Sequence, residues 1–248
     1  MGMGAATVRL ALLSEFSPAA EAEVLTWLNR QERDRLALIT APTRRRQFLA
    51  GHGLARHLAA AVGGGEAAAW GLCCGPHGAP ILLAPKRARC VLSVSLSHRG
   101  DWVGCAIAGT AIGLDLEVDA RPRDFVQMAK LSFSPDENTA LQKAPLAERS
   151  DRFYTYWTLK EAQAKYLGTG WCAGFSRQQT FRRCSAETAQ AINGNQGGLH
   201  WAVFGEPGLR VQFDSATVDL AESRCWSPTL ATADPDNQAL AGVASVVR

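Results

Sequence analysis

The chain carries its most informative stretch at residues 157–165, with the sequence WTLKEAQAK. The pattern predicts a helix on which Trp157, Glu161 and Lys165 follow one another at four-residue intervals and therefore share one face. An exposed Glu–Lys pair at this spacing contributes only ~0.3–0.5 kcal/mol. Taken alone, the stretch is therefore as consistent with an ordinary surface ion pair as with a functional site.

A second acidic pair lies about 45 residues upstream in a strand-like segment, residues 112–118, IGLDLEV. Alternation predicts that its leucines and Val118 point into a core, while Gly113, Asp115 and Glu117 share the other face. Two carboxylates so placed lie roughly 6–7 Å apart and repel unless a cation separates them. Mg²⁺ is the natural occupant, and we expect Gly113 to leave this face open to a ligand. An edge strand with a solvated acidic face is the alternative.

The two segments form one site if the predicted helix packs across the predicted strand. Glu161 would then supply a third carboxylate, and Lys165 would lie where a phosphate bound to the metal projects. Asp115, Glu117 and Glu161 are accordingly the candidate ligands of Mg²⁺.

Two further features indicate a phosphate-bearing ligand. Ser97-His98 ends an alternating strand, where a hydroxyl and an imidazole can hold a phosphate oxygen. Residues 44–46 are three arginines near a predicted helix start, where free amides and the helix dipole favour anions. The alternatives are a turn histidine, and a solvated basic turn or a nucleic-acid contact.

The predicted elements give an α+β protein. Strands are expected at residues 8–12, 91–97, 102–108, 112–118, 199–204 and 209–213, with hairpins at Arg99-Gly100 and Gly109-Thr110. Helices are expected from Ser17-Pro18 to about Leu38, from Pro42 to Gly63, from Ser134-Pro135, and around Trp157 up to Gly168, while residues 63–80 look like a loop. A faint repeat of an aromatic residue followed eight positions later by a base (Phe48 and Arg56, Trp157 and Lys165) indicates two related halves, 1–109 and 110–248. Chance recurrence is the alternative.

Composition limits the classes of function. The first half carries twelve Lys/Arg and seven Asp/Glu, and the second carries fourteen and sixteen, so the halves have net charges of +5 and −2. A basic half favours an acidic or phosphate-bearing partner. Stacking aromatics, a nucleic-acid module, a P-loop and a GxGxxG fingerprint are all missing from the sequence. We therefore expect no nucleic-acid partner.

The sequence also predicts the cellular setting. No apolar run approaches the ~20 residues that a membrane span needs, and the first residues lack the pattern of a secretory signal. The seven cysteines show no CxxC spacing, which favours a reducing cytoplasm over a disulfide framework or a zinc site. The last 20 or so residues are expected to be poorly ordered.

Taken together, the motifs resemble the 4′-phosphopantetheinyl transferase superfamily, in particular its surfactin-synthetase-activating (Sfp-type) branch. The family signature is a strand IGxDxE, a gap of about 40–45 residues and a helix WxxKEAxxK, which stand here at residues 112–117 and 157–165. Its SxSH and FSxxE elements correspond to residues 95–98 and 133–137, and its glycine loop to Gly168 and Gly170. The Arg-rich helix ending at Arg56 is similar to the family's CoA-binding helix.

The resemblance implies the fold and the activity. Two similar halves in a pseudo-twofold arrangement, each a small and mostly antiparallel sheet packed with helices, would enclose the active site at their junction. The enzyme would transfer 4′-phosphopantetheine from coenzyme A to a serine of an acyl, peptidyl or aryl carrier protein, with Mg²⁺, and would release adenosine 3′,5′-bisphosphate. A monomer would suffice, because one chain supplies both halves.

The resemblance also implies roles for single residues. Asp115, Glu117 and Glu161 would hold Mg²⁺, Glu161 would be the general base with Glu117 as the alternative, and Lys165 would stabilise the leaving phosphate. The residues expected to hold CoA are Arg45, Arg46, Ser97, His98, Lys160 and Lys165.

One departure from the family pattern affects CoA binding. Gly78-Ala79-Pro80 stands where relatives often have GKP. Either Lys86, Arg87 or Arg89 would replace that lysine, or phosphate binding would rest more on Arg45 and Arg46. A noncatalytic protein that binds CoA or a carrier on the same scaffold is the alternative function. The sequence leaves open which carrier and which pathway are served.

Overall fold

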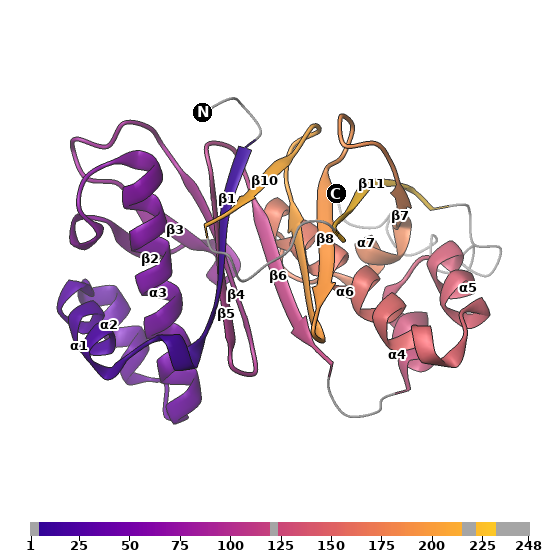
Figure 1. Cartoon of the computed structure of the whole chain (residues 1–248), viewed down its shortest axis with the longest axis horizontal. Coiled ribbons are helices and arrows are strands. Elements are labelled where there is room, and N and C mark those ends of the chain that lie inside the picture. Colours follow the sequence, from indigo (N-terminus) through magenta and orange to yellow (C-terminus); the bar gives the residue numbers. More distant parts are fainter. Residues whose placement is uncertain (1–4, 120–123, 215–221, 232–248) are drawn as a thin grey trace, which may run out of the picture.

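The computed structural model describes residues 5–119, 124–214 and 222–231. Two sheets lie face to face in the middle of the molecule, with helices α1, α2 and α3 covering one and helices α4 to α7 flanking the other (Figure 1). The expected α+β class, with helices packed on small and mostly antiparallel sheets, is thereby confirmed.

The first sheet has the strand order β10-β1-β5-β4. Its strands are β1 (Ala5–Leu12), β4 (Ser93–Arg99), β5 (Trp102–Ala108) and β10 (Arg210–Phe213). The helices on its outer side are α1 (Pro18–Trp27), α2 (Arg30–Ala37) and α3 (Pro42–Gly63), and a separate hairpin joins β2 (Gly71–Cys74) to β3 (Pro80–Leu83). Helix α3 packs on this sheet through a cluster that contains Ala55, Leu58 and Ile107.

The second sheet has the strand order β6-β9-β8-β11-β7. Its strands are β6 (Gly113–Val118), β7 (Gln179–Arg183), β8 (Ala191–Gln196), β9 (Leu199–Phe204) and β11 (Arg224–Leu230). The accompanying helices are α4 (Phe125–Ser132), α5 (Pro135–Lys143), α6 (Arg149–Leu167) and α7 (Ala173–Gln178). Helix α6 packs on the second sheet as α3 packs on the first. Its residues Leu159 and Ala162 join a hydrophobic cluster with Phe204 and Trp226.

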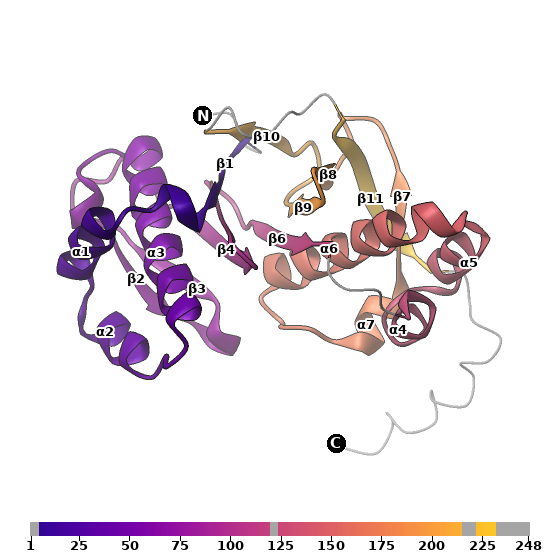
Figure 2. The same cartoon turned by 60° about the horizontal axis from the view of Figure 1, so that its bottom comes forward.

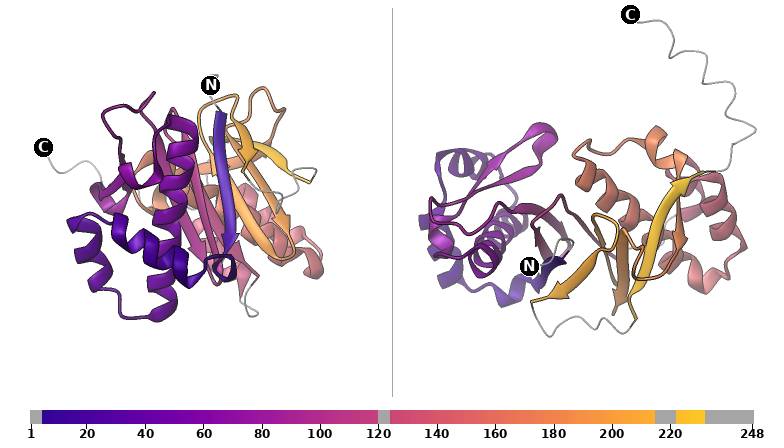
Figure 3. Two further views of the ribbon diagram at one scale, coloured as in Figure 1. Left: turned by 60° about the vertical axis from the view of Figure 1, so that its left-hand side comes forward. Right: turned by 90° about the horizontal axis from the view of Figure 1, so that it is seen from above.

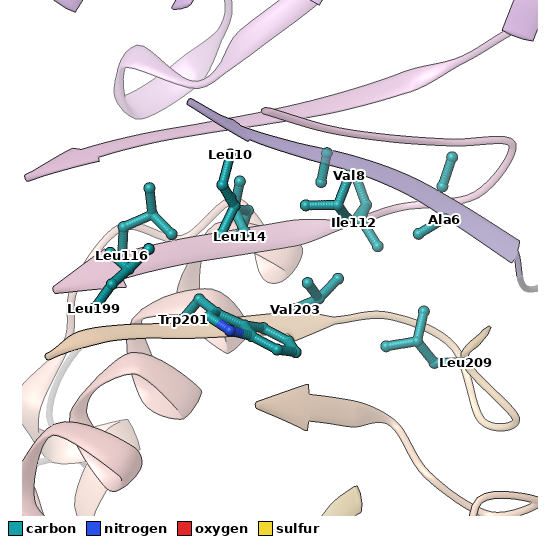
Figure 4. Packing of buried hydrophobic residues seen from close by; sticks show 12 residues of the cluster. Ala6, Val8, Leu10, Ile112, Leu114, Leu116, Leu199, Trp201, Val203 and Leu209 are labelled. Atoms are coloured by element: carbon teal, nitrogen blue, oxygen red, sulfur yellow. The ribbon is translucent and has the colours of Figure 1, made fainter. Parts of the chain in front are cut away.

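The central core fills the space between the two sheets. Figure 4 shows Val8 and Leu10 of β1 facing Leu114 and Leu116 of β6, with Trp201 of β9 beneath them. All five side chains are at most 2% exposed. This burial fixes the register of β6, and it confirms that the leucines of this strand point into a core while Asp115 and Glu117 point away from it.

Serine hydroxyls join the two sheets at one edge. Backbone N–H groups of Leu114 and Leu116 donate to Ser95 Oγ at 2.9 Å and to Ser97 Oγ at 3.1 Å. Strands β4 and β6 therefore lie side by side without a shared backbone ladder, and Figure 2 shows β6 between β4 and α6. The serine face of β4 thus connects the two sheets through hydrogen bonds to the backbone of β6.

Several local predictions hold and others do not. Ser134 caps α5 in the predicted capping box, and Gly168 ends α6 in the left-handed conformation at φ 66°. The helix predicted up to Leu38 is interrupted instead, because Asn29 and Glu32 form a capping box that starts α2. Residues 63–80 contain β2 rather than a loop alone.

The predicted hairpin at Gly109-Thr110 is also wrong. Strand β5 ends at Ala108, and the chain crosses here to the second sheet, where β6 pairs with β9. The hairpin at Gly100 is confirmed by the antiparallel pairing of Arg99 with Trp102.

The division into halves at residue 109 stays a prediction. Strand β10, from the second part of the chain, lies parallel to β1 and completes the first sheet (Figure 3). None of the described helices is both long and apolar enough to traverse a bilayer. The expected disorder of the last residues concerns positions 232–248, which lie outside the described residues.

Candidate active site

Helix α6 packs directly on β6, as the site hypothesis requires. A Cβ placed on Gly113 would overlap the carbonyl oxygen of Ala162 and lie 2.8 Å from the backbone nitrogen of Tyr166. The missing side chain of Gly113 therefore admits the helix. Our expectation that Gly113 leaves the strand face open to a ligand is wrong at this position.

This close packing brings Asp115 to Lys165. Lys165 Nζ donates to Asp115 Oδ1 at 2.7 Å, to Ser97 Oγ at 3.0 Å and to the carbonyl oxygen of Leu114 at 2.9 Å. Ser97 Oγ also donates to Asp115 Oδ1 at 3.0 Å. Ser97 is therefore bonded to the Asp115 carboxylate, to the Lys165 amine and to the backbone of β6.

The other two carboxylates lie in the same cleft. Glu117 Oε2 lies 2.8 Å from Arg99 Nε in an ion pair. Burial and the neighbouring Asp115 raise the pKa of Glu161 to about 7, with Lys165 opposing the shift and Glu117 adding to it. A carboxyl group in this position can exchange a proton near neutral pH.

Asp115 and Glu117 of the first motif and Trp157, Glu161 and Lys165 of the second line one cavity of about 320 Å³. Its walls come from β4, β6 and α6, and the lining residues are Leu96, Ser97, His98, Arg99, Asp115, Leu116, Glu117, Trp157, Glu161 and Lys165. The structure thus brings together side chains that are up to 69 positions apart in the sequence.

The donor set suits a divalent cation. Asp115 Oδ2 is buried and has no hydrogen-bond partner among the described residues. The pKa of Glu161 is raised first by burial and then by repulsion from Asp115 and Glu117. Within residues 5–119, 124–214 and 222–231, however, no group of three or more His, Cys, Asp or Glu side chains is arranged to hold a metal ion as it stands. The three-carboxylate site therefore stays a proposal.

A second cavity, of about 190 Å³, continues from His98 toward α3. Arg35, Arg44 and His98 line it, and neither arginine pairs with a carboxylate among the residues described. Burial lowers the pKa of Arg44, with a further contribution from Arg35. Burial, Arg44 and other cations lower the pKa of His98 to about 4, so its imidazole is neutral at pH 7. Two arginines without acidic partners among the described residues have the chemistry to bind a phosphate.

Arg45 and Arg46 lie outside these cavities and hold helices together. Arg45 donates to the carbonyl oxygen of Leu36 at 2.8 Å. Arg46 Nε lies 2.5 Å from Glu21 Oε1, and its Nη2 donates to the carbonyl oxygen of Leu13 at 3.0 Å. Their contacts do not support the prediction that they bind CoA, and Arg44 faces the cavity instead.

Lys160 is likewise a structural residue. Its Nζ lies 2.9 Å from Glu137 Oε2, donates to the carbonyl oxygens of Ser176 and Gln179 at 2.7 and 2.8 Å, and is 1% exposed. Consecutive residues of a helix face different directions, so Glu161 points into the cleft while Lys160 points into the core. The expected contact of Lys160 with CoA is incompatible with this burial.

A third cavity, of about 280 Å³, lies against Glu161 and Lys165. Its other walls include the Gly78-Ala79-Pro80 turn, Leu96 and Trp171. Trp171, which stacks on Trp157 with ring centroids 5.0 Å apart, was missed by sequence reasoning. Its signal was an aromatic residue directly after the predicted glycine loop.

Sequence reasoning also missed Arg35 and gave no separate weight to Arg44. Arg35 lies on α2, which was predicted as part of a longer helix, and its place beside Arg44 depends on how α2 and α3 pack. The replacements suggested for the missing GKP lysine, Lys86, Arg87 and Arg89, are absent from the residues that line these three cavities.

Fold and site together define a class of protein. Cations, a neutral imidazole and three carboxylates line a cleft between two sheets, an arrangement suited to positioning a phosphorylated substrate and stabilising charge during phosphoryl transfer. Residues 111–226 match the family model of the 4′-phosphopantetheinyl transferase superfamily. This segment belongs to that superfamily, as the two motifs predicted.

Individual relatives agree with the family match. HetI, a 4′-phosphopantetheinyl transferase of Nostoc sp., is 35% identical over 130 residues, which are 52% of this chain and 54% of the relative. A phosphopantetheinyl transferase of Thraustochytrium sp. is 31% identical over 188 residues, 70% and 63% of the two chains. Sfp of Bacillus subtilis is 37% identical over 76 residues, 31% and 33% of the two chains, which confirms the resemblance to the Sfp-type branch. The aligned segments thus span between a third and about three fifths of these relatives.

Proposed function

We propose that this protein is a 4′-phosphopantetheinyl transferase. It moves the phosphopantetheine arm of CoA to a serine of an acyl, peptidyl or aryl carrier protein and releases adenosine 3′,5′-bisphosphate. The observation that carries the proposal is the shared cavity of Asp115, Glu117, Glu161 and Lys165, which opens beside the Arg35, Arg44 and His98 cavity.

CoA binding is assigned to the basic side of the cleft. Arg35 and Arg44, which have no carboxylate partner among the described residues, offer their guanidinium groups to the phosphates of the nucleotide, and they stand in for the lysine that is absent at Ala79. Neutral His98 offers one ring nitrogen as donor and one as acceptor. Because the two halves supply different parts of the cleft, one chain contains the whole site.

Mg²⁺ is assigned to Asp115, Glu117 and Glu161. When bound there, the ion would neutralise charge on the pyrophosphate of CoA and on the leaving phosphate. Lys165 Nζ lies against Asp115 Oδ1 and offsets part of the charge that the ion would neutralise.

The acid–base roles follow from the environment of each group. Glu161, with its pKa raised to about 7, can accept the proton of the carrier serine at neutral pH, and Glu117 is the alternative base. Lys165 is 30% exposed, lies against Asp115 and is placed to stabilise the leaving phosphate. Ser97 positions both groups through its hydrogen bonds.

The proposed partner is a carrier protein, and a nucleic acid or a membrane is not part of the proposal. An acidic carrier would approach the part of the chain that carries the net charge of +5, where electrostatic attraction speeds docking. We place the enzyme in the cytoplasm and propose that it acts as a monomer.

A mass measurement tests the proposal. The purified protein, CoA and Mg²⁺ are incubated with a panel of apo carrier proteins, and each carrier is weighed by mass spectrometry. A gain of one phosphopantetheine is expected for at least one carrier, and Asp115→Asn should remove it. CoA binding by calorimetry without any gain across the panel would instead support the noncatalytic CoA-binding alternative.

A further inference from the structure

Two cysteines face each other across the outer strands of the second sheet. Strands β7 and β11 are antiparallel, with Arg183 opposite Trp226. The next step along both strands places Cys184 opposite Cys225, and the backbone N–H of Cys184 donates to the carbonyl oxygen of Cys225 at 3.2 Å. Directly opposed residues of an antiparallel pair project to the same side of the sheet.

The spacing of such a pair is compatible with a covalent link. Hydrogen-bonded partners have Cα atoms about 5.5 Å apart, inside the range of roughly 4.4–6.8 Å found for disulfides. Strand β7 is the edge strand of its sheet and ends at Arg183. Cys184 therefore has room for the small adjustment that would bring its sulfur to that of Cys225.

Both thiols are within reach of a small oxidant. Cys184 and Cys225 are free and partly exposed. Trp226 packs toward α6 in the core cluster, so its neighbour Cys225 points to the opposite face of the sheet. Burial, and after it the neighbouring Cys184, raises the pKa of the Cys225 thiol, as expected for two sulfur groups side by side.

We propose that Cys184 and Cys225 form a redox modification site, a dithiol that closes reversibly to a disulfide between β7 and β11. Cys73 and Cys74, also in a strand, are consecutive and point to opposite faces of β2, so they lack this arrangement. The proposal does not depend on the transferase activity.

The step balances with a low-molecular-weight disulfide such as oxidised glutathione. One thiolate of the pair attacks a sulfur of oxidised glutathione and releases one glutathione thiolate. The second protein sulfur then attacks the mixed disulfide and releases the other. Two protein thiols are oxidised, one glutathione disulfide is reduced to two thiols, and the two protons pass to glutathione.

The modification would fasten the outer end of the sheet. The link encloses residues 184–225, a long loop, and a covalent crosslink over a long loop restricts the unfolded chain more than a short one does. Reducing conditions would keep the pair open, and an oxidising shift would close it, which is the usual use of disulfides in a reducing compartment.

The test uses the full chain in oxidised and reduced glutathione buffers. Peptide mapping of the oxidised protein should recover one crosslinked peptide pair containing Cys184 and Cys225, with the mass of two hydrogen atoms lost, and dithiothreitol should reverse it. The oxidised protein should also melt at a temperature several degrees above that of the reduced protein.

Matched variants decide the interpretation. Cys184→Ser and Cys225→Ser should each abolish the crosslink and the rise in melting temperature, whereas Cys74→Ser, at an exposed cysteine elsewhere, should change neither. A stable glutathione adduct on one cysteine without ring closure, or a crosslink between another pair, would overturn the proposal. So would full protection of the two thiols from oxidised glutathione.

Discussion

Glu137 Oε2 lies 2.9 Å from Lys160 Nζ in an ion pair of which each side chain is only 1% exposed. The same glutamate closes the capping box of α5 on Ser134. Glu32 repeats the arrangement in the first half, closing the capping box of α2 while Oε2 lies 2.6 Å from Arg56 Nη2. Each half thus has a capping glutamate that reaches a buried cation on its long helix.

Lys160→Met should therefore unfold the protein rather than disable its chemistry. Removing one partner of a buried pair leaves Glu137 charged and uncompensated, a loss of about 3–5 kcal/mol in the free energy of unfolding. Denaturant titration measures this loss. Lys143→Met, at an exposed position on α5, is the matched control, for which we expect an almost unchanged midpoint. Equal stability of the two variants would contradict the structural role of Lys160.

Arg44→Ala should raise the KM for CoA by roughly 10- to 100-fold, with a smaller effect on kcat. A charged hydrogen bond to phosphate contributes about 1.5–3 kcal/mol, and binding that is equal in ground and transition states changes mainly KM. Arg45→Ala is the control, because the Arg45 side chain donates to the carbonyl oxygens of Leu36 and Ile39 at and just after the end of α2. Arg45→Ala should lower the stability of the protein and leave the KM for CoA near that of the parent. If Arg45→Ala raised the KM and Arg44→Ala did not, Arg45 would belong to the CoA site.

Gly113→Ala should disrupt the contact between β6 and α6. The added Cβ would overlap the backbone of Ala162, and backbone cannot yield as a flexible side chain does, so we expect a loss of at least about 3 kcal/mol in the free energy of unfolding. Gly109→Ala, where no atom lies within 4 Å of the added Cβ, should be close to neutral. Thermal melts of both variants check the pair, and a stable Gly113→Ala protein would show that the helix and strand are less tightly packed.

Glu161→Gln should lower kcat by roughly 10²–10⁴-fold, the range expected when a general base is removed. Chelation of divalent ions should abolish transfer by the parent protein, and added Mg²⁺ should restore it. If Glu161 is the base, Glu117→Gln should weaken the response to Mg²⁺ and spare more of kcat at saturating ion. If Glu117→Gln lowered kcat more than Glu161→Gln does, Glu117 would be the general base instead of Glu161. Transfer assays at several Mg²⁺ concentrations separate these outcomes.

Acid should destabilise the protein through the buried Glu32, His52 and Arg56 cluster. Burial raises the pKa of Glu32, but hydrogen bonds from His52, Arg56 and the backbone of Asn29 together lower it to about 2. A lowered carboxyl pKa stabilises the fold above the unfolded value of 4.5 and loses that effect as the pH falls toward 2. The loss amounts to roughly 2–3 kcal/mol.

Burial also lowers the pKa of His52, so the folded protein disfavours its protonation and loses further stability as the pH drops below the usual histidine value of 6.5. The free energy of unfolding, measured by denaturant titration from pH 7 to pH 3, should therefore decline throughout. Glu32→Gln should flatten the lower part of this profile. Glu23→Gln, at an exposed position, should retain the slope of the parent, and a flattened profile there would point to general charge repulsion instead.

The two motifs predicted which carboxylates and which lysine line one cavity because their spacing reports on local geometry. Alternation placed Asp115 and Glu117 on one face, and helical periodicity placed Trp157, Glu161 and Lys165 on another, so only the packing of α6 on β6 had to be supplied by the structure. The contacts of Lys160 do not support its predicted place in the CoA site, for a related reason. Motif membership does not say toward which side of a helix a residue points, and the partner Glu137 becomes visible only when α5 docks on α6.

The choice among the arginines could not be made from the sequence at all. Arg44, Arg45 and Arg46 are consecutive and chemically identical, and the angle of α3 against α1 and α2 decides which of them reaches the cavity. The same holds for β2, β7, β8 and β11, since short strands without strict alternation give a weak signal until neighbouring strands complete their hydrogen bonds.

The parallel pairing of β10 with β1 makes the two halves mutually dependent. Cleaving the chain at residue 109 would strip β1 of the neighbour that covers its outer edge, at positions 5–8, and would leave an unpaired strand open to self-association. Each fragment alone is then expected to aggregate. The separately expressed fragments 1–109 and 110–248 should nevertheless reassociate into the native fold when they are mixed. Fragment complementation is thus built into the way this chain completes its first sheet.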